Sequence, residues 1–238
     1  MWRSLVEQQI YGQPIAAESV EARGQFLQQV ALRTLGGLVL TAIVAAFSTL
    51  FIAPAVIQGG TWAILAVVYG SFFGAQFFGR KLVYGANKAA GFVVGTTLQG
   101  IALGFLLLIA IVTTAPGEGL QLIGYSLTMV ILSTAAMLLY VTIDKRDFSM
   151  MRAGLTMLGL PMLILMGLQL VLPMEGTAGL IVSGVFLAVS VGTLLYQLNA
   201  VLHTYPITMA TEASFELTLS IVVFFWNLLA FFLRFRRR

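Results

Sequence analysis

The order of apolar and polar positions divides the chain into seven long apolar stretches, and all charged residues lie between these stretches, at their ends or outside them. Each stretch is long enough to cross a hydrocarbon core of about 30 Å as a helix. The stretches are continuous rather than alternating, and a backbone in lipid must satisfy its own hydrogen bonds, so we expect α-helices and not barrel strands. The pattern predicts an all-α integral membrane protein, a seven-helix bundle with spans at residues 33–57, 61–79, 90–114, 120–143, 153–172, 177–199 and 216–233.

Polar segments at the two ends complete the predicted organisation. The N-terminal segment has the mixed apolar and charged spacing of a short helix lying in the membrane interface. A second helical segment is expected to begin near Glu18 and to continue into the first span. The predicted parts are a polar or interfacial arm at residues 1–32, a seven-helix transmembrane domain at 33–234 and a basic tail at 235–238.

Composition supports a membrane protein and argues against several soluble classes. Charged residues make up 9% of the chain, whereas a soluble domain carries about 25%. The net charge of +4 is better explained by topology and by contacts with lipid headgroups than by nucleic acid. The chain has no cysteine, which excludes disulfides and thiol chemistry. We therefore expect membrane lipid, and other membrane proteins, as partners, and no nucleic acid.

The positions of the basic residues predict the orientation in the membrane. Arginines and lysines lie before the first span, between spans two and three, and between spans four and five, whereas the opposite connections contain Glu118 and Glu175 and no basic residue. By the positive-inside rule the N-terminus is cytoplasmic. The arginines at 234 and 236–238 oppose this bias, and we favour a full crossing by the last helix. With no long charged tail or organellar targeting segment evident, we expect the bacterial inner membrane.

Glycines four residues apart predict where helices pack closely. The third span contains Gly91 and Gly95, followed by Gly100 and Gly104. Such spacing lets two helix backbones approach each other. Packing within the chain is the expected use, with dimerisation as the alternative.

Neutral amides are the main candidates for chemistry within the spans. Gln99, Gln197, Asn199 and Asn227 are hypothesised to line a polar cavity. The alternative is that they join helices by hydrogen bonds worth about 0.6 kcal/mol each. His203 is the only histidine, so no histidine-based metal cluster is possible. We expect no enzyme, no metal site and no cofactor.

The connection between the fourth and fifth spans is distinctive. It contains two basic residues that suit the carbonyl end of one helix, and residues that can cap the next; a tight, capped hairpin would explain it. The turn also resembles that of the Bax inhibitor-1 family, the transmembrane Bax inhibitor motif proteins. Segments 97–104, 195–199 and 224–232 resemble motifs of the family's third, sixth and last helices. The turn residues are Asp144, Lys145, Arg146, Asp147, Phe148 and Ser149.

The resemblance implies a fold in which six helices surround a central C-terminal helix. In bacterial members it also implies a calcium leak governed by two aspartates, which share a proton and pair with an arginine at the end of the second helix. Here the aspartate positions are occupied by Gln197 and Ser220, and the arginine corresponds to Arg80. We therefore expect the proton switch to be missing, Arg80 to lack a carboxylate partner, and any ion flux to be nearly independent of pH.

Two functions remain open from the sequence. The first is a non-catalytic membrane protein, an accessory subunit or interactor of a larger membrane complex or of membrane-protein quality control. The alternative is a calcium or cation leak channel without the usual proton-sensing aspartate pair. Calcium flux in liposomes and stoichiometric co-purification distinguish them.

Overall fold

The computed structural model describes residues 14–143, 154, 155, 157 and 176–236. Within these ranges the regular structure is helical, apart from one isolated bridge between Pro14 and Pro206. Two short segments, η2 and η3, are π-helices that continue the helices before them. The elements are η1 (Ile15–Ala17), α2 (Val20–Phe47), η2 (Ser48–Ile52), α3 (Ala53–Ile57), α4 (Gly60–Gly74), η3 (Ala75–Gly79), α5 (Arg80–Val83), α6 (Lys88–Val112), α7 (Glu118–Ile143), α9 (Gly176–His203), η4 (Ile207–Met209) and α10 (Ala210–Arg236).

Six helices of the described ranges are long and apolar enough to cross a membrane. They confirm six of the predicted stretches and the all-α integral membrane class. The predicted fifth span and the family turn at 144–149 lie outside the described residues, so the seventh helix stays a prediction. The six are Val20–Ile57, Thr61–Val83, Lys88–Val112, Glu118–Ile143, Gly176–His203 and Ile207–Arg236.

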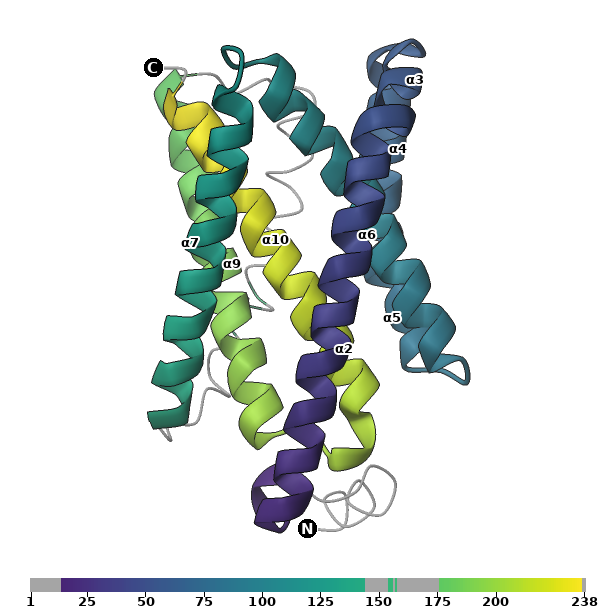
Figure 1. The fold of residues 1–238 in the computed structure, drawn as a ribbon, viewed down its shortest axis with the longest axis vertical. Helices are drawn as coiled ribbons and strands as arrows, with labels where there is room; N and C mark the ends of the chain where they lie inside the picture. Colours follow the sequence, from purple (N-terminus) through teal and green to yellow (C-terminus); the bar gives the residue numbers. More distant parts are fainter. Residues whose placement is uncertain (1–13, 144–153, 156, 158–175, 237–238) are drawn as a thin grey trace. The chain divides into compact units, whose positions relative to one another are not determined.

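The chain forms two compact units, which we describe separately. The first comprises residues 1–109 and 199–219, and the second comprises 110–198 and 220–238. Figure 1 shows the helices coloured along the chain, with α10 in yellow-green to yellow. The beginning of α10 belongs to the first unit and its remainder to the second. Of the six membrane-spanning helices, α10 is the most buried. This burial agrees with the expectation that the C-terminal helix is central.

In the first unit, α2 and α6 pack at close range through glycines and hydroxyls. A Cβ atom at Gly104 would lie 2.5 Å from the Cβ atom of Ser48, so only glycine fits there. Hydroxyl groups of α2 and η2 donate hydrogen bonds across this contact to carbonyl oxygens of α6. These contacts confirm that the glycines of α6 are used for packing within the chain. The bonds join Thr41 to Thr96, Ser48 to Ile101 and Thr49 to Gly104.

The start of α10 differs from the sequence prediction. We expected the last span to begin at residue 216 and every charged residue to lie at a span's end or outside it. The helix instead begins at Ala210, so Glu212 and Glu216 lie within it and are buried. They are tolerated because each is ion-paired. Between and beside them, Phe215 and Leu219 pack into the apolar core of the unit.

Candidate functional site: a charge cluster at the start of α10

Four charged residues meet at the start of α10, and we name them the charge cluster: Arg80, Lys88, Glu212 and Glu216. The glutamates stand four residues apart and so share one face of the helix. The Arg80 Nη2 atom lies 2.5 Å from Glu216 Oε2, and the Lys88 Nζ atom lies 2.6 Å from Glu212 Oε1. The glutamate side chains are only 6% and 3% exposed, whereas those of Arg80 and Lys88 are 48% and 46% exposed. The acids are therefore buried, and the bases link them to the surface.

The short connection between α5 and α6 brings the two bases to the same place. Arg80 is the first residue of the short helix α5, and Lys88 is the first residue of α6. Both bases therefore lie next to the connection that joins these two helices. A Cβ atom at Gly91 would overlap the backbone of Val83. This glycine therefore allows the two helices to approach closely beside the bases.

A second glycine contact sets the position of the acids. A Cβ atom at Gly79 would lie 2.9 Å from both the Cα atom of Gly95 and the ring of Phe215. The Phe215 ring also packs against Phe92 at a centroid distance of 6.1 Å. Because Phe215 directly precedes Glu216, this packing fixes the rotation of α10 that presents Glu216 to Arg80.

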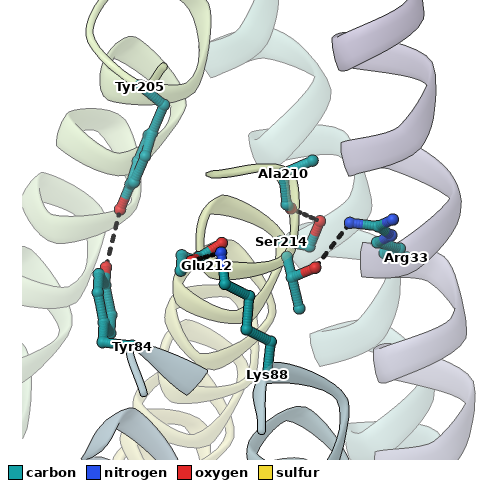
Figure 2. Close-up of polar contacts among 8 residues, drawn as sticks. Arg33, Tyr84, Lys88, Tyr205, Ala210, Glu212 and Ser214 are labelled. Atoms are coloured by element: carbon teal, nitrogen blue, oxygen red, sulfur yellow. Dashed lines mark hydrogen bonds and ion pairs between the residues drawn. The ribbon is translucent and has the colours of Figure 1, made fainter. Parts of the chain in front are cut away.

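Two tyrosines border the cluster. The hydroxyl groups of Tyr84 and Tyr205 lie 3.5 Å apart and face each other in Figure 2, where Lys88 also extends toward Glu212. Partial burial raises the pKa of the Tyr84 phenol, and the negative charge of Glu216 raises this pKa further. The neutral phenol is therefore favoured beside the carboxylate.

The electrostatics of the cluster balance. Two buried carboxylates would be costly alone, and each is neutralised by one base. The first turns of a helix also favour negative charge. The Oε2 atom of Glu212 is buried without a hydrogen-bond partner among the described residues. No group of three or more candidate metal ligands occurs in the described ranges.

The expectation that Arg80 lacks a carboxylate partner is wrong. Glu216 supplies one from α10, one helical turn before Ser220, where the resemblance placed the second aspartate. The aspartates themselves are absent, as expected, but a carboxylate is present beside the arginine. The argument for pH-independent flux, which rested on the absence of such a carboxylate, fails with it.

The other predicted site residues are divided between the two units. Gln99 and Asn199 belong to the first unit and are buried; the Gln99 Oε1 atom has no partner among the described residues, and Asn199 contacts His203. Gln197, Ser220 and Asn227 belong to the second. The described residues include no hydrogen bond between Gln197 and Ser220. A cavity lined by the four amides stays a prediction.

Sequence reasoning missed both glutamates and the tyrosine pair. The available signal was the spacing of Glu212 and Glu216, four residues apart and continuous with the helical phase of the apolar run that follows. We assigned the residues up to 215 to a connection and placed Glu216 at the very start of the span, because glutamate lowers hydropathy. Their basic partners lie more than a hundred residues away in the chain, so the local pattern gave no sign that the charges were neutralised.

The other end of α10 carries bases instead of acids. In the second unit Arg236 forms an ion pair with Glu118 at the start of α7, and Arg234 donates a 2.6 Å hydrogen bond to the carbonyl oxygen of Gly179 in α9. α10 thus begins beside the α5–α6 connection and ends beside the start of α7. The full crossing by the last helix that the sequence favours stays a prediction.

Apolar spanning helices with charges at their ends and in one buried cluster define a polytopic helical membrane protein. Residues 23–237 match the family described as inhibitor of apoptosis-promoting Bax1. The chain belongs to this family, the Bax inhibitor-1 family, which confirms the resemblance seen in the sequence.

Curated relatives span nearly the whole chain. The Golgi anti-apoptotic protein of Vaccinia virus strain Lister is 29% identical over 223 residues, which cover 92% of this chain and 89% of the relative. The Golgi anti-apoptotic protein of strain LC16m0 matches with the same figures.

Proposed function

We propose that this protein is a cation leak of its membrane and that the charge cluster is its gate. One observation carries the proposal: two buried carboxylates on a membrane-spanning helix, each neutralised by a base that is half-exposed. Ionisable residues at membrane depth are costly and generally mark ion pathways or proton relays. The chain is proposed to work without catalysis, metal or cofactor.

The gate works by competition. With Arg80 on Glu216 and Lys88 on Glu212, the carboxylates are neutralised and the bases repel cations. When a base moves away, its carboxylate becomes an anionic site for a passing cation. The unpartnered oxygen of Glu212 supports this reading, because it already offers an acceptor that Lys88 does not use. Calcium is the first cation to test.

Two substitutions with opposite effects test the gate in liposomes containing the full-length protein. Arg80→Gln leaves a free carboxylate and is expected to raise calcium flux, whereas Glu216→Gln leaves an uncompensated guanidinium and is expected to lower it. Glu118→Gln, at the exposed ion pair of the second unit, is the matched control and is expected to leave flux unchanged. Equal flux in all four proteins would refute the leak.

Low pH is expected to reduce calcium flux, as the substitution Glu216→Gln does. Protonation of Glu216 removes the anionic site while Arg80 keeps its charge. Flux should therefore fall as the pH is lowered, and the Glu216→Gln protein should lose this response. The comparison requires equal amounts of folded protein, which size-exclusion chromatography measures.

A second candidate is the accessory role predicted from the sequence. The relatives are named for resistance to apoptosis, an outcome that interaction with other membrane proteins can produce. The apolar helix faces support it, with Trp62 as an example at 85% exposed. Stoichiometric co-purification of a membrane partner in mild detergent, together with absent flux, would favour this role over the leak.

For location and orientation we propose the bacterial inner membrane with a cytoplasmic N-terminus. The basic residues of the α5–α6 connection support the orientation. Single cysteines at Asn87 and Pro116, both exposed, can be introduced into this cysteine-free chain and labelled with an impermeant thiol reagent in cells. Labelling of both positions from the same side would contradict the topology.

A further inference from the structure

The segment just before α2 lies against the connection between α9 and α10, and we name residues 14–17 the strap. The Ile15 backbone N–H group donates a 3.1 Å hydrogen bond to the carbonyl oxygen of Tyr205. Pro14 and Pro206 form an isolated antiparallel bridge. The Ile15 side chain is fully buried, at 0% exposed. The strap is thus a docked element with its own buried anchor.

The strap contact continues into the charge cluster through the tyrosine pair. Tyr205, which accepts the strap's hydrogen bond, faces Tyr84 through its hydroxyl group. Tyr84 in turn interacts electrostatically with Glu216. Figure 2 shows the two tyrosines beside the start of α10. The strap is therefore linked to Glu216 by one backbone hydrogen bond, one contact between tyrosine hydroxyl groups and one electrostatic interaction.

The helix that follows the strap holds the same part of α10. The Ser214 hydroxyl donates to the carbonyl oxygen of Ala210 at 2.5 Å and also contacts the carbonyl oxygen of Val30 at 3.3 Å. The Arg33 guanidinium donates to the Thr211 hydroxyl at 2.7 Å. Both contacts with α2 lie within the first turns of α10. The N-terminal side of the chain therefore restrains the helix that carries Glu212 and Glu216.

We propose that the strap is a latch that keeps the charge cluster closed. A movement of the backbone that separates Glu216 from Arg80 shifts the first turns of α10 or shifts α5. A docked strap opposes this shift because it fixes the connection that leads into α10. One buried isoleucine and one backbone hydrogen bond favour the docked state by about a hundredfold, so the latch holds at rest and still opens. The flux expected on opening rests on the proposed leak; the latch itself does not.

The first test measures opening without flux. Ser214 is fully buried, at 0% exposed, and Ser214→Cys provides a single reporter thiol between the two glutamates. Adding Ile15→Asp places a charge at the buried anchor and should release the strap. We expect labelling by a water-soluble maleimide to accelerate at least about fivefold, the effect of losing one backbone hydrogen bond.

Ala16→Asp is the matched control, since Ala16 is the exposed neighbour in the strap. It is expected to leave the labelling rate of the reporter unchanged. Equal rates for Ile15→Asp and Ala16→Asp would overturn the latch. A wild-type elution profile in size-exclusion chromatography, required of both proteins, excludes general unfolding as the cause of faster labelling.

The second test locks the strap reversibly. Residues opposite each other in an antiparallel pair have Cα atoms about 4.5–5.5 Å apart, within reach of a disulfide. Pro14→Cys with Pro206→Cys therefore creates the only disulfide of this cysteine-free chain. We expect oxidised protein in liposomes to conduct less calcium than the same protein after reduction, and Ile15→Asp to conduct more than wild type.

The outcomes separate the two proposals. Faster labelling in Ile15→Asp with no flux in any protein supports the latch and rejects the leak. The opposite result is calcium flux that is present but equal in the oxidised, reduced and Ile15→Asp proteins, together with unchanged labelling. It supports the leak and rejects the latch.

Discussion

The two ends of α10 use charge in opposite ways. At its start, within the first unit, the helix supplies acids that are buried and receives bases from α5 and α6. At its end, within the second unit, it supplies bases, and its partner Glu118 is 34% exposed. Both arrangements suit the helix dipole, which favours acids near the N-terminus and bases near the C-terminus. The difference lies in burial.

Burial decides what each set of contacts contributes. An exposed ion pair is worth about 0–1 kcal/mol because water and salt screen it. A buried carboxylate cannot be left without a partner, and so it enforces a specific arrangement of the helices around it. The contacts at the end of α10 therefore contribute little to the free energy of unfolding, whereas those at its start determine how the helices around them are arranged.

The largest expected effect comes from removing one base at each end. Arg80→Ala leaves the buried Glu216 carboxylate uncompensated and should lower the free energy of unfolding by about 3 kcal/mol. Arg236→Ala leaves a partly exposed Glu118 and should cost less than about 1 kcal/mol. Unfolding of the purified proteins in mixed detergent measures both. Equal losses would remove the distinction between the two ends.

The same glycine substitution in each unit should give the next largest difference. A Cβ atom at Gly95 would overlap the ring of Phe215, whereas one at Gly184 would lie 3.7 Å from the Phe231 ring, an ordinary contact. Gly95→Ala should therefore destabilise by about 2 kcal/mol through overpacking. Gly184→Ala should be neutral or slightly stabilising, because alanine is the better helix former. The apparent melting temperatures of the two variants provide the comparison.

Alkaline pH should affect the first unit through Tyr84. Its pKa in the folded protein is raised above the ordinary value of 10.0 by partial burial and by Glu216. The stabilising contribution is therefore complete below pH 10.0 and is lost as the pH rises through the higher folded pKa. Thermal stability of the wild type should decline more steeply above pH 10 than that of Tyr84→Phe.

Tyr125→Phe is the matched control for this pH dependence. Tyr125 lies on α7 in the second unit and is 63% exposed. This variant should retain the slope of the wild type. Parallel curves for all three proteins would show that Tyr84 does not sense the carboxylate.

The smallest effect is expected at the outer contact of α10. Thr211→Val removes the 2.7 Å hydrogen bond from Arg33, which lies at an exposed position. Because both groups remain accessible to water, the loss in the free energy of unfolding should be about 0.5 kcal/mol. A loss comparable to that of Arg80→Ala would place Arg33 within the buried network. The same detergent titration measures it.

The membrane class and six of the helices could be predicted from the sequence because lipid imposes a simple rule on length and hydropathy. Close packing at Gly100 and Gly104 followed from the spacing of small residues in the same way. α2 begins at Val20 behind the capping residue Ser19, close to the predicted start near Glu18. Each of these features depends on residues that are neighbours along one helix.

The charge cluster could not be predicted by the same rule. Glu212 and Glu216 make the start of α10 resemble a polar connection, because hydropathy counts each charge as if it were alone. In the fold Arg80 and Lys88 cancel those charges from distant positions in the chain. The docking of Ile15 against Tyr205 is hidden for the same reason, since neither residue is unusual in its own segment.

The π-helix η3 has a mechanical consequence for Arg80, which directly follows it. A π-helix accommodates one residue more than the α-helical turn it replaces, and one residue corresponds to a rotation of about 100° around a helix axis. The winding of η3 therefore sets the direction in which the Arg80 side chain projects from the helix axis. If η3 adopted α-helical winding with the length of the chain unchanged, Arg80 would turn away from Glu216 by about this rotation. A change of helical winding, with every residue and every charge kept, would then break the ion pair.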